Sequence, residues 1–148
     1  MSTARADVDP VRADVLGAIA AGGMTGALGR YGLGLLWPHP TGNFPWATLV
    51  INLSGSLLIG VLLGELARRP SAHRLWRPLL GVGLLGGYTT FSTFTVDALQ
   101  LADHGRAGVA VTYVLATVAA GALAVRLGAT AVARRQIRSW PEDPEAVP

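Results

Sequence analysis

A run of nine residues, Gly86 to Phe94, has the sequence Gly-Gly-Tyr-Thr-Thr-Phe-Ser-Thr-Phe and lies inside an apolar stretch long enough to cross a membrane. Two adjacent glycines weaken a helix, and a Thr-Thr pair offers the backbone competing hydrogen bonds. Irregular backbone at membrane depth persists only where protein packs around it or where it lines a polar cavity. The run therefore predicts a pore or a binding site rather than a plain span.

Two kinds of ligand group are present in this run. Carbonyl groups at a helix break lose their helical partners and can coordinate an alkali cation, which makes Gly86 and Thr89 candidates for main-chain ligation. Phe91 and Phe94 are three residues apart and share a helix face. These rings are either ordinary core or lipid-facing aromatics, or they present their positive edges to a small anion.

Asn52 places an amide in the preceding apolar stretch. An amide has two N–H donors and one carbonyl acceptor, and it needs partners in lipid. Two interpretations stay open: the side chain holds two helices together, or it donates to an anion.

Residues for catalysis are not grouped in this sequence. His39, His73 and His104 fall in or near loops, and the chain has no cysteine. Nucleophile-elbow, phosphate-loop and zinc-protease motifs do not occur, so we predict that the chain is not an enzyme. Glu65 and Asp97 lie near the ends of apolar stretches, where we expect them to reach water rather than to act at the membrane centre.

The composition is that of a membrane protein. Hydrophobic residues make up 51% of the 148 residues and charged residues only 14%, against about 25% in a soluble domain. Apolar stretches of at least ~20 residues cover 15–37, 47–67, 78–101 and 107–133. We therefore predict an all-α integral membrane protein with four transmembrane helices, the third broken near its middle.

We expect one channel domain with polar ends. The predicted segments are a polar N-terminal segment at 1–14, a four-helix transmembrane domain at 15–135 and a Pro-rich acidic tail at 136–148, which we expect to be disordered. Small residues recur at four-residue spacing, either for packing within the bundle or for a dimer face. Because four helices leave little room for a private pore, we favour a pore shared with a second subunit.

The arginines are distributed unevenly between the two sides. Only Arg106 lies in a loop on the side opposite the termini, and Arg30 and Arg126 fall within spans. This bias predicts a multi-pass protein of the cell membrane with both termini in the cytoplasm, and it argues against nucleic acid as a partner. The arginines on the side of the termini are Arg5, Arg12, Arg68, Arg69, Arg74, Arg77, Arg134, Arg135 and Arg138.

The run from Gly86 to Phe94 resembles the signature of the Fluc (CrcB) fluoride channels, and the segments 52–56 and 29–31 are similar to that family as well. The resemblance covers roughly residues 15–133. It implies a subunit of an antiparallel dimer with two fluoride pores, giving passive fluoride efflux and fluoride resistance. It also implies a structural sodium ion (Na+) that is held at the dimer axis and is not transported.

The resemblance assigns roles to individual residues. Gly86 and Thr89 look like the main-chain ligands of sodium, and Arg30 resembles an arginine that either attracts anions to a vestibule or snorkels. Gly121 has no hydroxyl where some members of the family carry one. The residues that resemble the fluoride pore are Asn52, Phe91, Ser92, Thr93, Phe94, Tyr113 and Thr117.

The arginine bias is unexpected in a subunit that inserts in both directions. We predict a fixed orientation and pairing with a homologous subunit that faces the other way; a homodimer stands if acidic residues or the chain ends blunt the bias. A small multidrug efflux transporter is the alternative, but it needs a glutamate in the first span, and residues 15–37 contain no acidic residue. A non-transporting subunit of a membrane complex would not explain the hydroxyls and rings at 86–94.

Overall fold

The computed structural model describes residues 12–69 and 71–138, and these form helices joined by short loops, with no strand among them. Residues 1–11 and 139–148, which hold Arg5 and most of the two predicted terminal segments, lie outside the described part. The helices are α1 (Ala13–Leu36), α2 (Trp46–Arg68), η1 (Arg77–Leu85), α3 (Gly86–Tyr88), α4 (Phe91–Asp103) and α5 (Ala107–Arg138).

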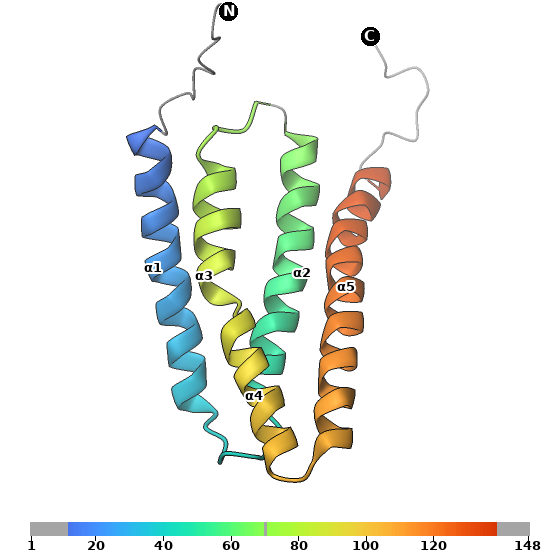
Figure 1. Ribbon diagram of the computed structural model, residues 1–148. Coiled ribbons are helices and arrows are strands. Elements are labelled where there is room, and N and C mark those ends of the chain that lie inside the picture. Colours follow the sequence, from blue (N-terminus) through green and yellow to red (C-terminus); the bar gives the residue numbers. More distant parts are fainter. Residues whose placement is uncertain (1–11, 70, 139–148) are drawn as a thin grey trace, which may run out of the picture.

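The helices run side by side and alternate in direction, so α1 begins at the end of the molecule where α5 finishes (Figure 1). Helix η1 has the wider π winding and continues directly into α3, and the two form a single rod. The all-helical prediction is confirmed for the described residues.

In the part of the chain that the structure describes, three segments are long and apolar enough to cross a membrane: Trp46–Arg68, Arg77–Asp103 and Ala107–Arg135, with mean hydropathies of 1.9, 1.3 and 2.0. Helix α1 is not among them, although it has 24 residues. These lengths are those of a multi-pass membrane protein. A fourth span through α1, and a membrane-embedded break in the third, stay predictions.

Small residues let the helices approach closely within the chain. A Cβ atom on Gly26 of α1 would overlap the carbonyl oxygen of Leu84 in η1, and one on Gly60 of α2 would overlap the carbonyl of Val125 in α5. Both glycines are buried. At these positions the four-residue spacing serves packing inside the bundle, which was one of the two interpretations of the pattern.

One ion pair fastens α1 to the loop between α2 and η1. The guanidinium of Arg74 hydrogen-bonds the carboxylate of Asp14, and Arg12 lies 3.6 Å from the same carboxylate. The hydrogen bond from Arg74 holds the pKa of Asp14 below its ordinary value. The tie is therefore present at neutral pH and is lost only as pH falls through that lowered pKa.

Gly60→Ala tests the close approach of α2 and α5. We expect this substitution to lower the free energy of unfolding by about 1–3 kcal/mol, because a methyl group has no space against the Val125 carbonyl. Gly34→Ala is the matched control, since a Cβ there meets nothing within 4 Å. Thermal unfolding of the detergent-purified protein measures both, and equal midpoints would contradict the packing.

Candidate functional site

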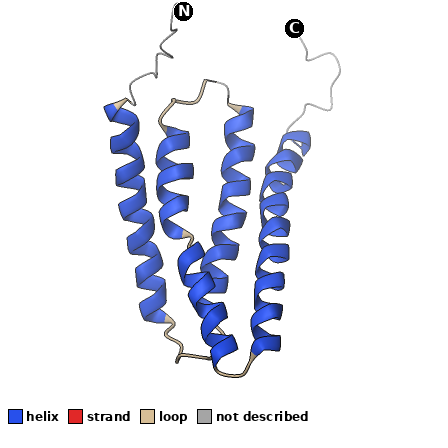
Figure 2. Cartoon of the chain, viewed as in Figure 1, coloured by secondary structure: helices blue, strands red, loops and turns tan. Residues whose placement is uncertain are grey.

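The helical path from η1 to α4 is interrupted at Thr89 and Thr90, whose ψ angles are 160° and 125° (Figure 2). The hydroxyl of Thr89 donates to the carbonyl of Leu85 at 2.9 Å and closes the first rod. The hydroxyl of Thr90 accepts from the N–H of Thr93 at 3.1 Å and caps α4. The Thr-Thr pair thus ends one helix and starts the next.

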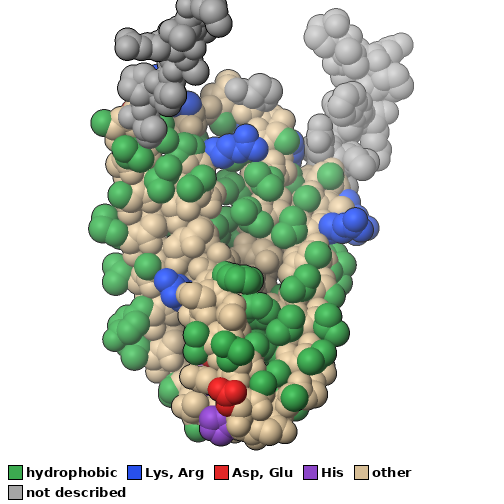
Figure 3. Space-filling view, in the orientation of Figure 1, with side chains coloured by type: hydrophobic (Ala, Val, Ile, Leu, Met, Phe, Trp, Pro, Cys, Tyr) green, Lys and Arg blue, Asp and Glu red, His purple; other side chains and the backbone are tan. Residues whose placement is uncertain are grey.

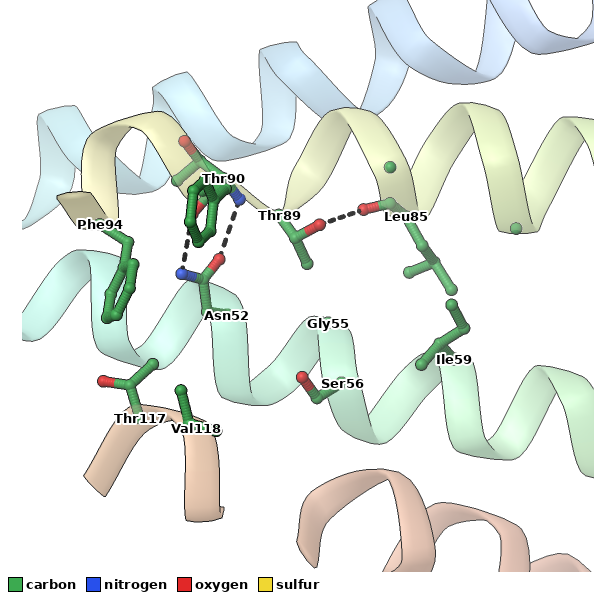
Figure 4. A pocket seen from close by; sticks show the side chains of 13 residues that line it. Asn52, Gly55, Ser56, Ile59, Leu85, Thr89, Thr90, Phe94, Thr117 and Val118 are labelled. Atoms are coloured by element: carbon green, nitrogen blue, oxygen red, sulfur yellow. Dashed lines mark hydrogen bonds between the residues drawn. The ribbon is translucent and has the colours of Figure 1, made fainter. Parts of the chain in front are cut away.

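Asn52 of α2 bonds the backbone at this break. The N–H of Thr90 donates to Oδ1 of Asn52 at 2.9 Å, and Nδ2 of Asn52 donates to the carbonyl of Thr90 at 3.0 Å (Figure 4). The amide therefore joins two helices, as one interpretation of the sequence held. Within the described residues only one of its two N–H donors has a partner, so the second is available to a ligand.

These bonds free two carbonyl groups. In an unbroken helix the N–H groups of Thr90 and Thr93 would bond the carbonyls four residues earlier, those of Gly86 and Thr89. Here both N–H groups are bonded elsewhere, to Asn52 and to the Thr90 hydroxyl. These two carbonyls are among those at the end of the rod that lose their helical donors, and they are the ones that sequence reasoning put forward as cation ligands.

The next carbonyl in the run has a different partner. Arg30 of α1 donates its Nε to the carbonyl of Gly87 at 3.1 Å. The side chain is half-buried, and this contact was part of neither interpretation of Arg30 from the sequence. A cation thus lies against the carboxyl end of the rod, where the helix dipole is negative.

A cavity of about 370 Å³ lies beside the break, between α2, the interrupted helical path from η1 to α4, and α5 (Figure 4). No charged side chain lines it within the described residues. Its polar and aromatic lining residues are Asn52, Ser56, Thr89, Thr90, Phe91, Phe94 and Thr117. The residues of the predicted set that line it are therefore Asn52, Gly86, Thr89, Phe91, Phe94 and Thr117.

The two phenylalanines have different surroundings. Their ring centroids are 5.9 Å apart with the planes tilted by 41°. Phe94 is 9% exposed and packs on Tyr113 at 5.2 Å, whereas Phe91 is 80% exposed. Phe94 is thus a core residue of this chain and Phe91 is not. The ring of Phe91 therefore forms an outer wall of the cavity that no other part of the described chain covers.

Three residues of the predicted fluoride pore, Ser92, Thr93 and Tyr113, do not line the cavity but contact residues that do. The hydroxyl of Thr90 donates to that of Thr93 at 3.0 Å, and the hydroxyl of Ser92 lies 3.3 Å from the Thr90 hydroxyl oxygen. Tyr113 is fully buried, and its hydroxyl has no hydrogen-bond partner in the part of the chain that the structure describes. A buried donor without a partner is costly, so this hydroxyl is a further candidate for a ligand contact.

Sequence reasoning missed a polar cluster one turn beyond Phe94. Asp97 is 6% exposed; its carboxylate accepts from the hydroxyl of Thr48 at 2.6 Å and lies 3.6 Å from Nε2 of His39. The expectation that Asp97 reaches water was wrong, because α2 and the loop after α1 cover that face of α4. An acidic residue three positions after Phe94 was the available signal.

Comparison with known proteins identifies relatives over most of the chain. The family model described as CrcB-like protein, Camphor Resistance (CrcB), matches residues 17–129. A protein of Streptomyces coelicolor named fluoride-specific ion channel FluC 1 is 43% identical over 129 residues, which cover 87% of this chain and 82% of the relative. The fluoride-specific ion channel FluC 2 of Nocardia farcinica is 44% identical over 139 residues, covering 90% and 99%.

Thr48→Val tests the Asp97 cluster. We expect it to lower the free energy of unfolding by about 1–3 kcal/mol, since the buried carboxylate of Asp97 loses its hydroxyl donor. Thr112→Val is the control, because that exposed hydroxyl bonds only its own helix. Thermal unfolding in detergent separates them; a Thr48→Val protein as stable as the control would show that the bond contributes nothing.

Proposed function

The chain belongs to the CrcB-like family, as its resemblance predicted, and we propose that it is a subunit of a fluoride-selective channel. The observation that carries the proposal is the cavity at the helix break, which combines an amide, hydroxyls and aromatic rings and has no charged side chain among the described residues that line it. Fluoride needs donors to replace its water. A fixed cation in the path would hold the ion too tightly for conduction.

The hydrogen bonds within the chain indicate which polar groups are available to donate to fluoride. The hydroxyls of Thr89 and Thr117 already donate to carbonyls of Leu85 and Tyr113. The second N–H of Asn52 and the hydroxyl of Tyr113 have no partner among the described residues. In this proposal they are the donors to the anion.

The position of Phe94, between Asn52 and Tyr113, indicates the route of the proposed fluoride path. Phe94 lines the cavity with Asn52, and its ring centroid is 5.2 Å from that of Tyr113. The anion path thus runs from Asn52 past the ring edges of Phe91 and Phe94 toward Tyr113. Ring edges carry partial positive charge and can contact a halide without binding it permanently.

The freed carbonyls fit an alkali cation. Hard cations prefer oxygen ligands, carbonyl oxygens among them, and the carbonyls of Gly86 and Thr89 have lost their helical donors to Asn52 and to the cap of α4. A sodium ion held there would supply positive charge that offsets the cost of bringing an anion into the membrane.

The assembly we propose is an antiparallel dimer. In this proposal Gly86 and Thr89 bring two carbonyls to the cation site, and Phe91 projects from the chain at the cavity wall. A second subunit in the opposite orientation would bring another pair of carbonyls and cover this ring. The arginine bias favours a homologous partner of opposite orientation over a second copy. The dimer would lie in the cell membrane with both termini of this chain cytoplasmic and let fluoride leave passively.

Phe91→Ile tests the path with little risk to folding, because the ring is 80% exposed. We expect fluoride efflux from liposomes to fall about tenfold or more, since the ring edge that contacts the ion is lost. Leu99→Ile is the control on the same helix, exposed and outside the cavity lining. Undiminished efflux from Phe91→Ile would place the path elsewhere, and equal chloride flux would refute the selectivity.

Asn52→Asp is the stronger variant. It replaces the amide donor to the Thr90 carbonyl and puts a negative charge in the cavity, so efflux should stop. Normal efflux would exclude Asn52 from the path.

Sodium dependence tests the cation site separately. We expect the purified protein to unfold at a higher temperature in sodium chloride than in N-methylglucamine chloride of equal ionic strength, because a ligand of the folded state stabilises it by mass action. Identical midpoints over a wide sodium range would count against the site.

A further inference from the structure

A second cavity, of about 490 Å³, lies where α2 ends and η1 begins. Its walls are of two kinds. One is basic, with Arg69, Arg74 and Arg77, and the other is apolar, with Leu63 and Leu66. Figure 3 shows arginine side chains at this end of the molecule, above a surface that is largely apolar. The cavity is separate from the proposed fluoride path, and none of its residues lines that path.

The basic wall has more positive than negative charge. Glu65 lies 3.7 Å from both Arg68 and Arg69, which is too far for a hydrogen bond. The N–H donors of Arg69 are therefore not used by this carboxylate. Arg77 has no acidic partner among the described residues.

The apolar wall continues along the groove between the two helices. An adjoining cavity of about 310 Å³ shares Leu66 and Arg69 and extends to Leu62 and Leu80; Glu65, the ion-pair partner of Arg69, also lines it. Trp76 lines the same groove and is 48% exposed. An amphipathic aromatic ring at the end of an apolar helix is typical of the boundary between headgroups and hydrocarbon.

We propose that this pair of cavities binds one anionic phospholipid. A guanidinium group can donate two parallel hydrogen bonds to two phosphate oxygens, so Arg77 and Arg69 are suited to bind a phosphodiester. The leucine-lined groove suits an acyl chain. A basic pocket between membrane helices has this combination when it binds a lipid headgroup. The Asp14–Arg74 tie keeps the loop wall in place, so the pocket exists before the lipid arrives.

Lipid binding to the detergent-purified full chain tests the proposal. Phosphatidylglycerol, phosphatidylcholine and inorganic phosphate are titrated separately, with bound lipid counted by native mass spectrometry and the unfolding midpoint followed in parallel. We expect phosphatidylglycerol to bind and to raise the midpoint, and the other two to do so far less.

Arg77→Gln should weaken phosphatidylglycerol binding about fivefold, the effect expected of one arginine near a membrane surface. Arg126→Gln is the matched control, because Arg126 is exposed on α5 and does not line the cavity. If Arg77→Gln does not fold, Arg69→Gln takes its place, since Arg68 still pairs with Glu65.

Three results would overturn the proposal. Equal weakening by Arg77→Gln and Arg126→Gln would mean that binding follows overall charge and not this pocket. Equal binding of phosphatidylcholine would remove the requirement for an anionic headgroup. A midpoint shift with inorganic phosphate as large as with the lipid would make this a free-phosphate site. None of these results depends on fluoride flux.

Discussion

The paired hydrogen bonds between Asn52 and the backbone of Thr90 are the interaction on which the candidate site depends. The N–H of Thr90 has lost its helical acceptor, and Oδ1 of Asn52 replaces it, while Nδ2 adds a bond to the Thr90 carbonyl, which is also the first acceptor of α4. The break can therefore exist within an apolar stretch without leaving the N–H of Thr90 unbonded. Every other feature of the site, from the freed carbonyls to the direction of α4, follows from the chain turning at this point.

Local chemistry explains what could be predicted from the sequence. Glycine pairs and adjacent threonines act on their own backbone, so irregularity near Gly86 and Thr89 was visible in the residues themselves. The all-helical fold followed from long apolar stretches, because lipid requires each backbone group to be bonded within its segment. Family membership followed from the same nine residues, and the comparisons confirm it.

Contacts between distant residues explain what was missed. Asn52 and Thr90 are 38 positions apart, and Arg30 and Gly87 are 57 apart, so no local pattern specifies either pair. Asp97 was misjudged for the same reason. Its position near the end of an apolar stretch suggested contact with water, but Thr48 and His39, which are distant in the sequence, pack against its carboxylate. The π winding of η1 likewise could not be predicted from the length and composition of the apolar stretches.

The bond between Arg30 and Gly87 has a consequence for biosynthesis. Arg30 emerges from the ribosome long before its acceptor, and α1 does not meet the hydropathy that the other three segments have. An arginine in an isolated helix opposes membrane insertion, by about 2.5–3.5 kcal/mol at the helix centre and by less toward the ends, where Arg30 lies. The predicted insertion of α1 into the membrane would therefore be coupled to η1 and α3, which are translated after it and supply the acceptor for Arg30.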